Sequence, residues 1–260
     1  MADFSPWFLT SARAAIAAVL GAAFLLALRQ PRPARADFLP LLIVALGVVV
    51  GFPLLTALAL KLVTSAHAIV FIGLLPLATA IFGVLRGGER PKPAFWLFAC
   101  LGAASVAAFA FGRGGSEGGS FLGDGLMVAA ILVCGLGYAE GATLSRRLGG
   151  WQVISWALLL SLPLMGAIAL FTLPLQWSGI GAPAWFGLFY VSVFSMLIGF
   201  VFWYRGLAQG GIAGVGQLQL LQPLCGLILA AIFLHETVAW TMIASAAMVV
   251  ACVAGARRYA

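Results

Sequence analysis

Long apolar runs, separated by short polar breaks, make up most of this chain. A helix needs about 20 apolar residues to cross the hydrocarbon core of a bilayer. Transmembrane β-strands would instead alternate in polarity over about ten residues, and the runs here are continuously apolar. We therefore expect an all-α membrane protein, a polytopic bundle of nine transmembrane helices. The nine predicted spans are residues 6–28, 38–60, 64–85, 95–111, 125–144, 151–173, 182–204, 212–233 and 241–256.

The longest polar stretch lies between the fourth and fifth predicted spans. Residues 112–124 read GRGGSEGGSFLGD. Glycine loses more conformational freedom than any other residue when it is fixed in a helix. We therefore expect a flexible connector over these residues.

Composition narrows the class further. Of the 260 residues, 63% are hydrophobic and 8% are charged, and the mean hydropathy is +1.13. Soluble domains carry about 25% charged residues, so this chain could not cover a folded surface in water. The composition excludes an ordinary soluble enzyme, a nucleic-acid-binding module and a disordered protein.

The basic residues predict the orientation. The loops after spans one, three, five and seven, with the C-terminus, hold 11 of them, and the opposite side holds only Lys61 and Arg113. Cytoplasmic loops carry the excess of Lys and Arg, so we expect a cytoplasmic C-terminus. The net charge of +7 is then a topology signal, and no nucleic-acid partner is expected. The larger set consists of Arg29, Arg32, Arg35, Arg86, Arg90, Lys92, Arg146, Arg147, Arg205, Arg257 and Arg258.

The chain also repeats itself at an offset of 147 in the numbering. At this offset Pro76 falls on Pro223, and Glu89 falls on Glu236. Five helices separate the copies, and an odd number predicts that they are inverted relative to each other, as in many secondary transporters. We expect a first repeat over residues 1–116 with four helices and a second over residues 117–260 with five. The fifth span has no counterpart, so the pattern is that of a five-plus-five protein without its first helix.

The repeated pattern resembles the drug/metabolite transporter superfamily, in its EamA-type branch. Small residues, L-P-L or Q-P-L, an apolar run and then E-R or E-T occur twice, around Pro76 and Glu89 and again around Pro223 and Glu236. Ser5-Pro6 followed by Arg13 also resembles the family's second helix. The resemblance implies ten helices in two inverted repeats around a central cavity. It further implies transport of small metabolites, often amino acids or related compounds, and frequently their export.

Two ionisable residues fall inside predicted spans, where such groups are costly and are by default functional candidates. Arg13 can contact an anion or carboxylate, or it can snorkel or bind helix-end carbonyls. Glu140, beside Tyr138, can carry a proton or hold a cationic substrate group. Its alternative is an ion pair with Arg147, two helical turns further on.

The eighth span has the densest set of neutral polar residues, Gln217, Gln219 and Gln222. In an α-helix, Gln219 and Gln222 share a face and Gln217 points away. We expect at least one of these faces to meet protein or water, either along a substrate pathway or through hydrogen bonds between helices. Pro76 and Pro223 predict kinks in the third and eighth spans.

Other polar residues have competing interpretations. His67 can titrate near neutral pH or be a hydrogen-bonded structural residue, and Trp203 can stack on substrate or belong to an aromatic belt. Glu89 and Glu236 are interpreted as residues that organise loops. The candidates for the substrate pathway are Arg13, His67, Tyr138, Glu140, Trp203, Gln217, Gln219 and Gln222.

Glycines four residues apart, at Gly47 and Gly51 and at Gly137 and Gly141, allow helix backbones to approach closely, although glycine is also simply frequent here.

These features favour a secondary transporter of the bacterial inner membrane. No catalytic, metal-binding or nucleotide-binding motif stands in a suitable context, so we expect no enzyme activity, no cofactor and no metal. The expected partners are a small-molecule substrate and membrane lipid, with proton coupling as an option and a monomer or homodimer as the assembly. The alternatives are an intramembrane enzyme acting on lipid-like substrates and a membrane partner protein without transport activity.

Overall fold

The computed structural model describes residues 4–63, 68, 71–112, 120–222, 225 and 240–260. Over these residues the chain is helical, with turns and loops and no strand. The predicted all-α class is confirmed. Large apolar side chains remain open on the surface, among them Phe121 and Phe171, as expected of helices that face lipid.

The contacts divide the chain into two compact units. Unit 1 combines Met1–Ala57 with Leu136–Gln209, and unit 2 combines Leu58–Gly135 with Gly210–Ala260. Each unit therefore takes one segment from the first half of the chain and one from the second half. The two boundaries near residues 57 and 135 fall inside helices, so two helices are shared between the units.

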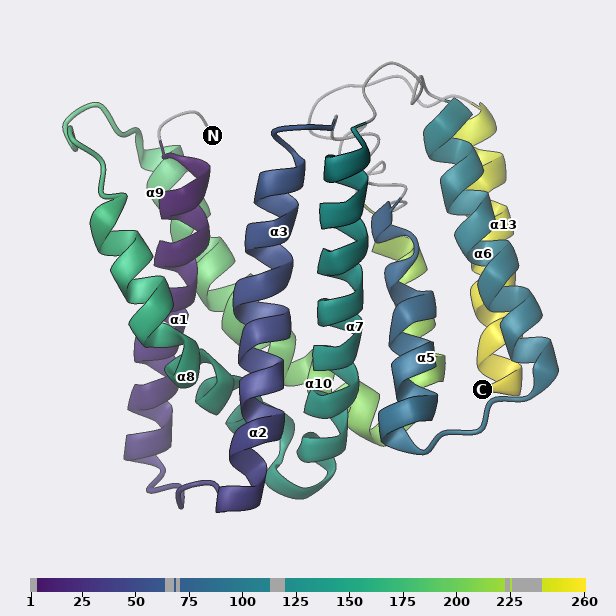
Figure 1. Cartoon of the computed structure of the whole chain (residues 1–260), viewed down its shortest axis with the longest axis horizontal. Helices are drawn as coiled ribbons and strands as arrows, with labels where there is room; N and C mark the ends of the chain where they lie inside the picture. The colour runs from purple at the N-terminus through teal and green to yellow at the C-terminus, as the bar shows by residue number, and fades with distance from the viewer. Residues whose placement is uncertain (1–3, 64–67, 69–70, 113–119, 223–224, 226–239) are drawn as a thin grey trace. The chain divides into compact units, whose positions relative to one another are not determined.

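Unit 1 is built from helices of both halves (Figure 1). Ser5 starts the first helix by accepting a hydrogen bond from the Phe8 amide at 3.1 Å, ahead of Pro6 in the first turn. Two of the long apolar helices contain a π-helical segment. The elements are α1 (Pro6–Ala27), α2 (Arg35–Val44), π-helix η1 (Ala45–Gly51), α3 (Phe52–Ala59), α7 (Phe121–Leu148), α8 (Gly150–Phe171), α9 (Ala182–Tyr190), π-helix η2 (Val191–Ile198) and α10 (Gly199–Gly210).

Small residues set the packing of unit 1. Helix α1 lies along α8, and at the crossing a Cβ on Gly21 would stand 3.2 Å from the Ser155 Cα. A Cβ on Gly137 would stand 3.6 Å from the Gly47 Cα. The prediction that these glycines let backbones approach is confirmed for Gly47 and Gly137.

Unit 2 is organised around a second pair of long helices, α6 and α13. The rings of Phe98 and Tyr259 stack at 6.0 Å, and Gly255 leaves room for the Phe98 ring. Phe95 is fully buried beside this pair. The further elements are α5 (Leu75–Gly87), α6 (Pro93–Gly112), α11 (Ile212–Gly216), the 3-10 helix η3 (Gln217–Leu221) and α13 (Trp240–Tyr259).

Five described helical stretches are long and apolar enough to cross a membrane, which agrees with predicted spans one, two, five, six and seven. The fifth begins earlier than predicted, because α7 starts at Phe121, inside the segment expected to be a connector. The Ser120 hydroxyl and carbonyl accept from the Gly123 and Asp124 amides, which fixes the first turn despite the nearby glycines. The five stretches are Pro6–Ala27, Arg35–Ala59, Phe121–Leu148, Gly150–Phe171 and Ala182–Gly210.

Helix bounds recur at the offset of the sequence repeat. Residues 35 and 182, which begin α2 and α9, are 147 apart. Residues 51 and 198, which end the two π-helical segments, are also 147 apart. The copies therefore share local backbone features as well as sequence.

Pro76 does not kink a continuous helix as predicted. The chain turns at residues 73–74, where the Leu74 amide donates to the Phe71 carbonyl at 2.8 Å. Helix α5 then begins at Leu75 with Pro76 in its first turn. Proline has no amide hydrogen to donate and fits the first turn, where none is needed, so the helix breaks and restarts here.

Candidate functional site

An aromatic cluster in unit 1 contains two of the residues expected along the substrate pathway. The rings of Tyr138 and Trp203 meet edge to face at 5.5 Å. Tyr204 and Phe200 adjoin the same tyrosine at 6.4 and 6.2 Å. Helices α7 and α10 are thus joined by four rings, with an apolar body and polar tips.

Glycines on α7 make room for this cluster. A Cβ on Gly141 would come within 2.5 Å of the Tyr204 ring carbon Cζ. The Tyr204 hydroxyl reaches the Gly137 carbonyl oxygen at 3.4 Å, and the ring is fully buried. The spacing of Gly137 and Gly141 thus serves ring packing as well as the backbone approach to Gly47.

Four polar atoms of unit 1 are buried without a hydrogen-bond partner among the described residues, namely Arg13 Nε, Thr56 Oγ1, Gln152 Oε1 and Trp203 Nε1. Arg13 on α1 and Trp203 on α10 supply the two donors among them. Buried donors are nearly always bonded, and an unbonded one costs about 1–3 kcal/mol. Both residues were predicted for the pathway, and both retain a donor that a substrate or water can satisfy.

Glu140 is also buried, with 5% of its surface exposed. It follows Tyr138 by two residues, so the two side chains leave α7 about 160° apart. They do not line one face of the helix. The alternative ion pair between Glu140 and Arg147 is wrong, because Arg147 Nη2 bonds instead to the Oδ1 of Asp37.

Asp37 is a residue that the sequence analysis missed. Its carboxylate, 1% exposed, accepts from the Ala34 amide at 3.1 Å through Oδ2 and from Arg147 through Oδ1. Asp37 is the third residue of α2, and its carboxylate accepts from the amide of the N-cap residue Ala34, which is the half of a capping box that an acidic third residue supplies. Its place shortly after Pro33 was the sequence signal that could have identified Asp37 as a capping residue. Nothing in the sequence indicates that its ion-pair partner is Arg147, which lies in the other half of the chain.

In unit 2 the glutamines separate by burial. Gln217 is fully buried and Gln219 is 8% exposed, whereas Gln222 is exposed. Gln219 and Gln222, which are expected to share a helix face, thus differ in burial. The cause is that η3 packs against α5, α6, α11 and α13, so that opposite sides of this short 3-10 helix are covered.

The two buried glutamines lack hydrogen-bond partners within the described part of the chain. Both amide atoms of Gln217 and the Oε1 of Gln219 are unbonded there. A Gln side chain offers two donors and two acceptor sites, so Gln217 can receive a ligand group that both donates and accepts. This is the most polar unsatisfied point among the described residues of unit 2.

Glu89 holds the start of the same segment. Its carboxylate oxygens accept from the Ile212 amide at 2.5 Å and the Ala213 amide at 2.7 Å. Gly88 has φ +66° and Gly211 has φ +86°, a backbone region that suits glycine, and these turns bring the carboxylate to the helix start. The interpretation of Glu89 as a residue that organises a loop agrees with these bonds.

Comparison with known proteins places these features in a family. The model of the EamA-like transporter family matches residues 1–111 and 121–257. This chain belongs to the EamA-like transporter family. It is 66% identical over 260 residues to the "Uncharacterized transporter YdeK" of Bacillus subtilis (strain 168), covering all of this chain and 90% of that protein.

The fold of this EamA-like transporter also resembles a solved structure. That structure, described as "Crystal structure of protein", superposes with a TM-score of 0.83 over 98% of this chain and 89% of its own, at 21% identity. At this identity the likeness concerns the fold alone. Together with the apolar helices, the family makes the protein a multi-pass membrane transporter.

Some predicted positions of the transporter lie outside the described residues, namely His67, Pro223 and Glu236. Among the residues that are described, no three His, Cys, Asp or Glu side chains gather as a metal site would require.

The basic residues of the transporter cluster at one end of each unit. In unit 1, Arg147 meets Asp37, and the Nε of Arg146 donates to the Ala208 carbonyl at 3.3 Å. These bonds join three loops that the charge count assigned to one side. In unit 2, the Lys92 amide donates to the Tyr259 carbonyl at 2.9 Å.

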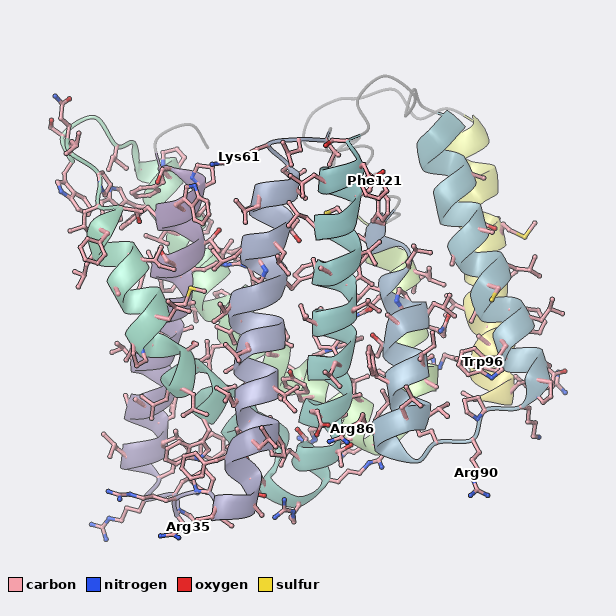
Figure 2. All side chains as sticks on the ribbon, viewed as in Figure 1. Arg35, Lys61, Arg86, Arg90, Trp96 and Phe121 are labelled. Atoms are coloured by element: carbon pink, nitrogen blue, oxygen red, sulfur yellow. The ribbon has the colours of Figure 1, made fainter. Side chains whose placement is uncertain are left out.

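Figure 2 shows the corresponding separation within unit 2. Arg86 and Arg90 lie at one end of its helices, and Lys61 and Phe121 lie at the other. The charge sorting read from the loops is thus matched by the placement of labelled residues inside a single unit.

Proposed function

We propose that this transporter is a secondary transporter that exports small metabolites, such as amino acids or related amphiphilic compounds, by alternating access between two inverted repeats. The observation that carries the proposal is the recurrence of helix bounds at the offset of the sequence repeat, at the starts of α2 and α9 and at the ends of the two π-helical segments. Two copies of one repeat in opposite orientations give a transporter two equivalent gates, one on each side of the membrane.

The arrangement of helix pairs supports the proposal. Helices α6 and α13, which are counterparts at this offset, pack against each other in unit 2. In unit 1, α1 packs against α8, whose residues 153–171 are counterparts of α1 residues 6–24. Elements that a two-fold axis relates and that lie next to it contact their own copies. An odd number of helices between the copies makes that axis run in the membrane plane.

The charge distribution supports a cytoplasmic C-terminus in the bacterial inner membrane. Arg257 and Arg258 lie in the last turn of α13. The carbonyl of Tyr259, the last residue of this helix, accepts from the Lys92 amide in the loop before α6. That loop carries Arg90 and Lys92. The positive-inside rule assigns such ends to the cytoplasm.

Substrate contact is assigned to buried polar groups without partners among the described residues. Arg13 supplies a cationic donor for a carboxylate, and Gln217 supplies an amide for a donor–acceptor pair. Trp203 and Tyr138 supply an apolar wall. Within unit 1, Arg13 and the two rings suit compounds that combine a charged group with an apolar body, which is the amphiphilic character proposed for the substrate.

The experiment is counterflow with the purified protein in liposomes. Vesicles loaded with an unlabelled amino acid mixture should accumulate labelled amino acids, and Arg13→Gln or Gln217→Leu should lower the initial rate about tenfold, the loss expected for a charged or buried hydrogen bond. Exposed residues give matched controls, Arg32→Gln and Gln222→Leu, which should stay within about twofold. Wild-type vesicles without counterflow would overturn this substrate class.

Proton coupling is assigned to Glu140, a buried carboxyl on a spanning helix. Glu140→Gln should abolish the dependence of flux on pH while leaving counterflow at fixed pH measurable. The same flux as wild type at every pH would remove Glu140 from the mechanism. Export is checked separately, by loss of labelled substrate from preloaded cells that express the protein.

A further inference from the structure

A cavity of about 460 Å³ in unit 1 has no role in the features described so far. It lies where α7 ends, α8 begins and α10 passes, at the basic end of the unit. Its volume falls in the range of small-molecule and cofactor sites, about 300–1,000 Å³. Five helix-end residues, Arg146, Gly150, Trp151, Gln152 and Arg205, give it its chemistry.

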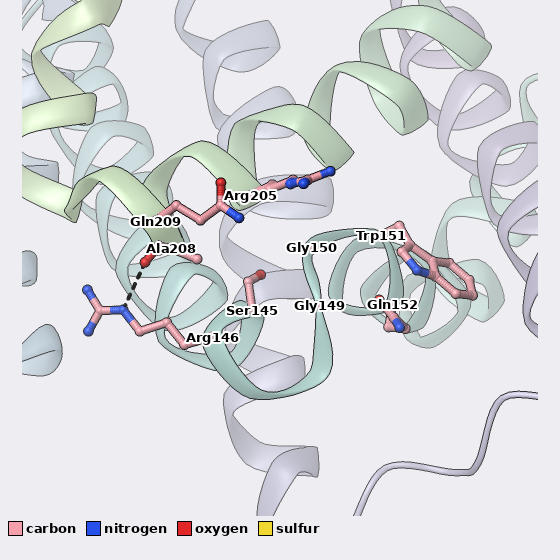
Figure 3. Close-up of a pocket in the computed structure, with 9 residues that line it drawn as sticks. All are labelled: Ser145, Arg146, Gly149, Gly150, Trp151, Gln152, Arg205, Ala208 and Gln209. Carbon is pink, nitrogen blue, oxygen red and sulfur yellow. Dashed lines mark hydrogen bonds between the residues drawn. The ribbon is translucent and has the colours of Figure 1, made fainter.

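Two arginines stand on different walls of this cavity (Figure 3). Arg146 comes from the end of α7 and is held by its Nε, which donates to the Ala208 carbonyl at 3.3 Å. Arg205 comes from α10. In Figure 3 the Arg146 guanidinium group lies to the left of the turn at Gly149 and Gly150, and the Arg205 side chain lies above that turn. The described residues that line the cavity include no acidic side chain, so its lining is cationic.

The start of α8 adds neutral polar groups to the same cavity. No side chain of a described residue caps this helix, and helix starts favour negative charge. Gln152 folds back so that its Cδ would lie 3.0 Å from a Cβ on Gly149, and its Oε1 is buried without a partner among the described residues. That oxygen requires a donor, which a free phosphate dianion does not offer as readily as a glycerol hydroxyl.

The location favours a ligand anchored in the bilayer. Trp151 lines the cavity at the helix end, and tryptophans concentrate at the level of lipid head groups. Basic pockets between membrane helices on the cytoplasmic side are suited to phosphate-bearing head groups. Two separated guanidinium groups match two phosphates joined through glycerol better than they match a single phosphate.

We infer that this cavity binds the head group of an anionic phospholipid with two phosphates bridged by glycerol, as in cardiolipin. The arginines bind the phosphates by charge-assisted hydrogen bonds, and Gln152 accepts from the bridging hydroxyl. This site does not depend on the proposed substrate or on the direction of transport, because its residues are separate from Arg13, Glu140 and Gln217.

The test measures lipid binding to the delipidated full chain by native mass spectrometry. The probes are cardiolipin, phosphatidylglycerol, phosphatidylcholine and inorganic phosphate. Wild type should bind cardiolipin most tightly and phosphatidylglycerol next. The pair Arg146→Gln with Arg205→Gln should weaken cardiolipin binding about tenfold or more, the loss expected when charged hydrogen bonds are removed.

A control with the same loss of charge uses two exposed arginines outside the cavity. Arg32→Gln with Arg90→Gln should change the affinity less than about twofold, as surface substitutions usually do. Equal weakening by both pairs would mean non-specific attraction and would overturn the site. Equally tight binding of inorganic phosphate and of cardiolipin to the wild-type protein would overturn the lipid as its ligand.

Replacing Arg146 could also disturb the fold, because its Nε donates to the Ala208 carbonyl on α10. The single variant Arg205→Gln controls for this effect. It should weaken cardiolipin binding about threefold or more without changing the melting temperature in lipid-free detergent. Gln152→Leu should reduce the preference for cardiolipin over phosphatidylglycerol measured on the same variant. Unchanged affinity in Arg205→Gln would contradict the assignment.

Discussion

Buried polar groups differ between the basic ends of the two units and the interiors of their helices in whether they have hydrogen-bond partners. At the ends, Asp37 and Glu89 each bind two donors of their own unit. In the interiors, Arg13, Trp203 and Gln217 keep buried polar atoms without partners among the described residues. Both regions hide polar groups from solvent, so burial alone does not separate them.

The difference shows which buried polar residues stabilise this fold and which do not. A buried carboxylate with good partners fixes the chain, and the two that have been described fix loop and helix ends. A buried polar group without a partner weakens the fold, so it persists where binding needs it. Among these residues the satisfied groups belong to the scaffold and the unsatisfied ones to the candidate pathway, whereas the unsatisfied Gln152 Oε1 belongs to the cavity at the basic end of unit 1.

The largest effect is expected at Asp37. Asp37→Ala removes the cap of α2 and leaves Arg147 without its carboxylate, so the free energy of unfolding should fall by about 2–4 kcal/mol. Thermal or denaturant unfolding in detergent measures it. Arg147→Gln keeps the cap of α2 but leaves the buried Asp37 carboxylate without its cation, so it should cost less than Asp37→Ala but more than the roughly 1 kcal/mol of an exposed ion pair. A loss no larger than that of Arg147→Gln would mean that Asp37 is not the anchor.

The next largest effect on stability is expected in the interior of unit 1, where the aromatic cluster around Tyr204 leaves no space. Gly141→Ala would drive a methyl group into the Tyr204 ring, and overpacking of this kind costs about 1–3 kcal/mol. Gly187→Ala, on α9, meets nothing within 4 Å and should be neutral or stabilise by up to about 1 kcal/mol. Similar melting temperatures for both variants would show that the ring cluster yields easily.

A smaller loss is expected from Glu89→Gln. The amide keeps one acceptor oxygen for the α11 backbone and turns a donor toward the second amide, so about 1–2 kcal/mol is lost. Hydrogen exchange at the Ile212 and Ala213 amides should rise about tenfold, with no comparable change at Phe8, whose amide is bound by Ser5. Unchanged exchange at both amides would separate Glu89 from the start of α11.

Sequence reasoning succeeded where local physics decides. Continuous apolar runs predicted the long helices within a few residues, and the offset of the repeat predicted where helix bounds recur. Glycine spacing predicted the approach of Gly137 to Gly47 because that contact depends only on small size. These signals are carried by single segments or by the chain compared with itself.

It failed where partners come from elsewhere in the chain. Arg147 lies two turns from Glu140, but its actual partner Asp37 belongs to a helix in the other half of the chain. Helical periodicity did not indicate which glutamines are buried, because the burial of Gln217 and Gln219 depends on the surrounding helices. Pro76 restarts a helix because a turn precedes it, and a proline alone does not tell a kink from a break.

The smallest expected effect has the opposite sign and separates scaffold from pathway most directly. Gln217→Leu removes an amide that is buried without a partner among the described residues, so the free energy of unfolding should rise by about 1 kcal/mol. The exposed Gln222, on the next turn of the chain, gives the matched control Gln222→Leu, which should change little. A gain in melting temperature together with lost counterflow would place Gln217 among residues kept for binding at a cost in stability. A loss of stability would instead mean that the amide supports the fold, as Asp37 and Glu89 do, and the distinction between satisfied ends and unsatisfied interior would fail at its clearest residue.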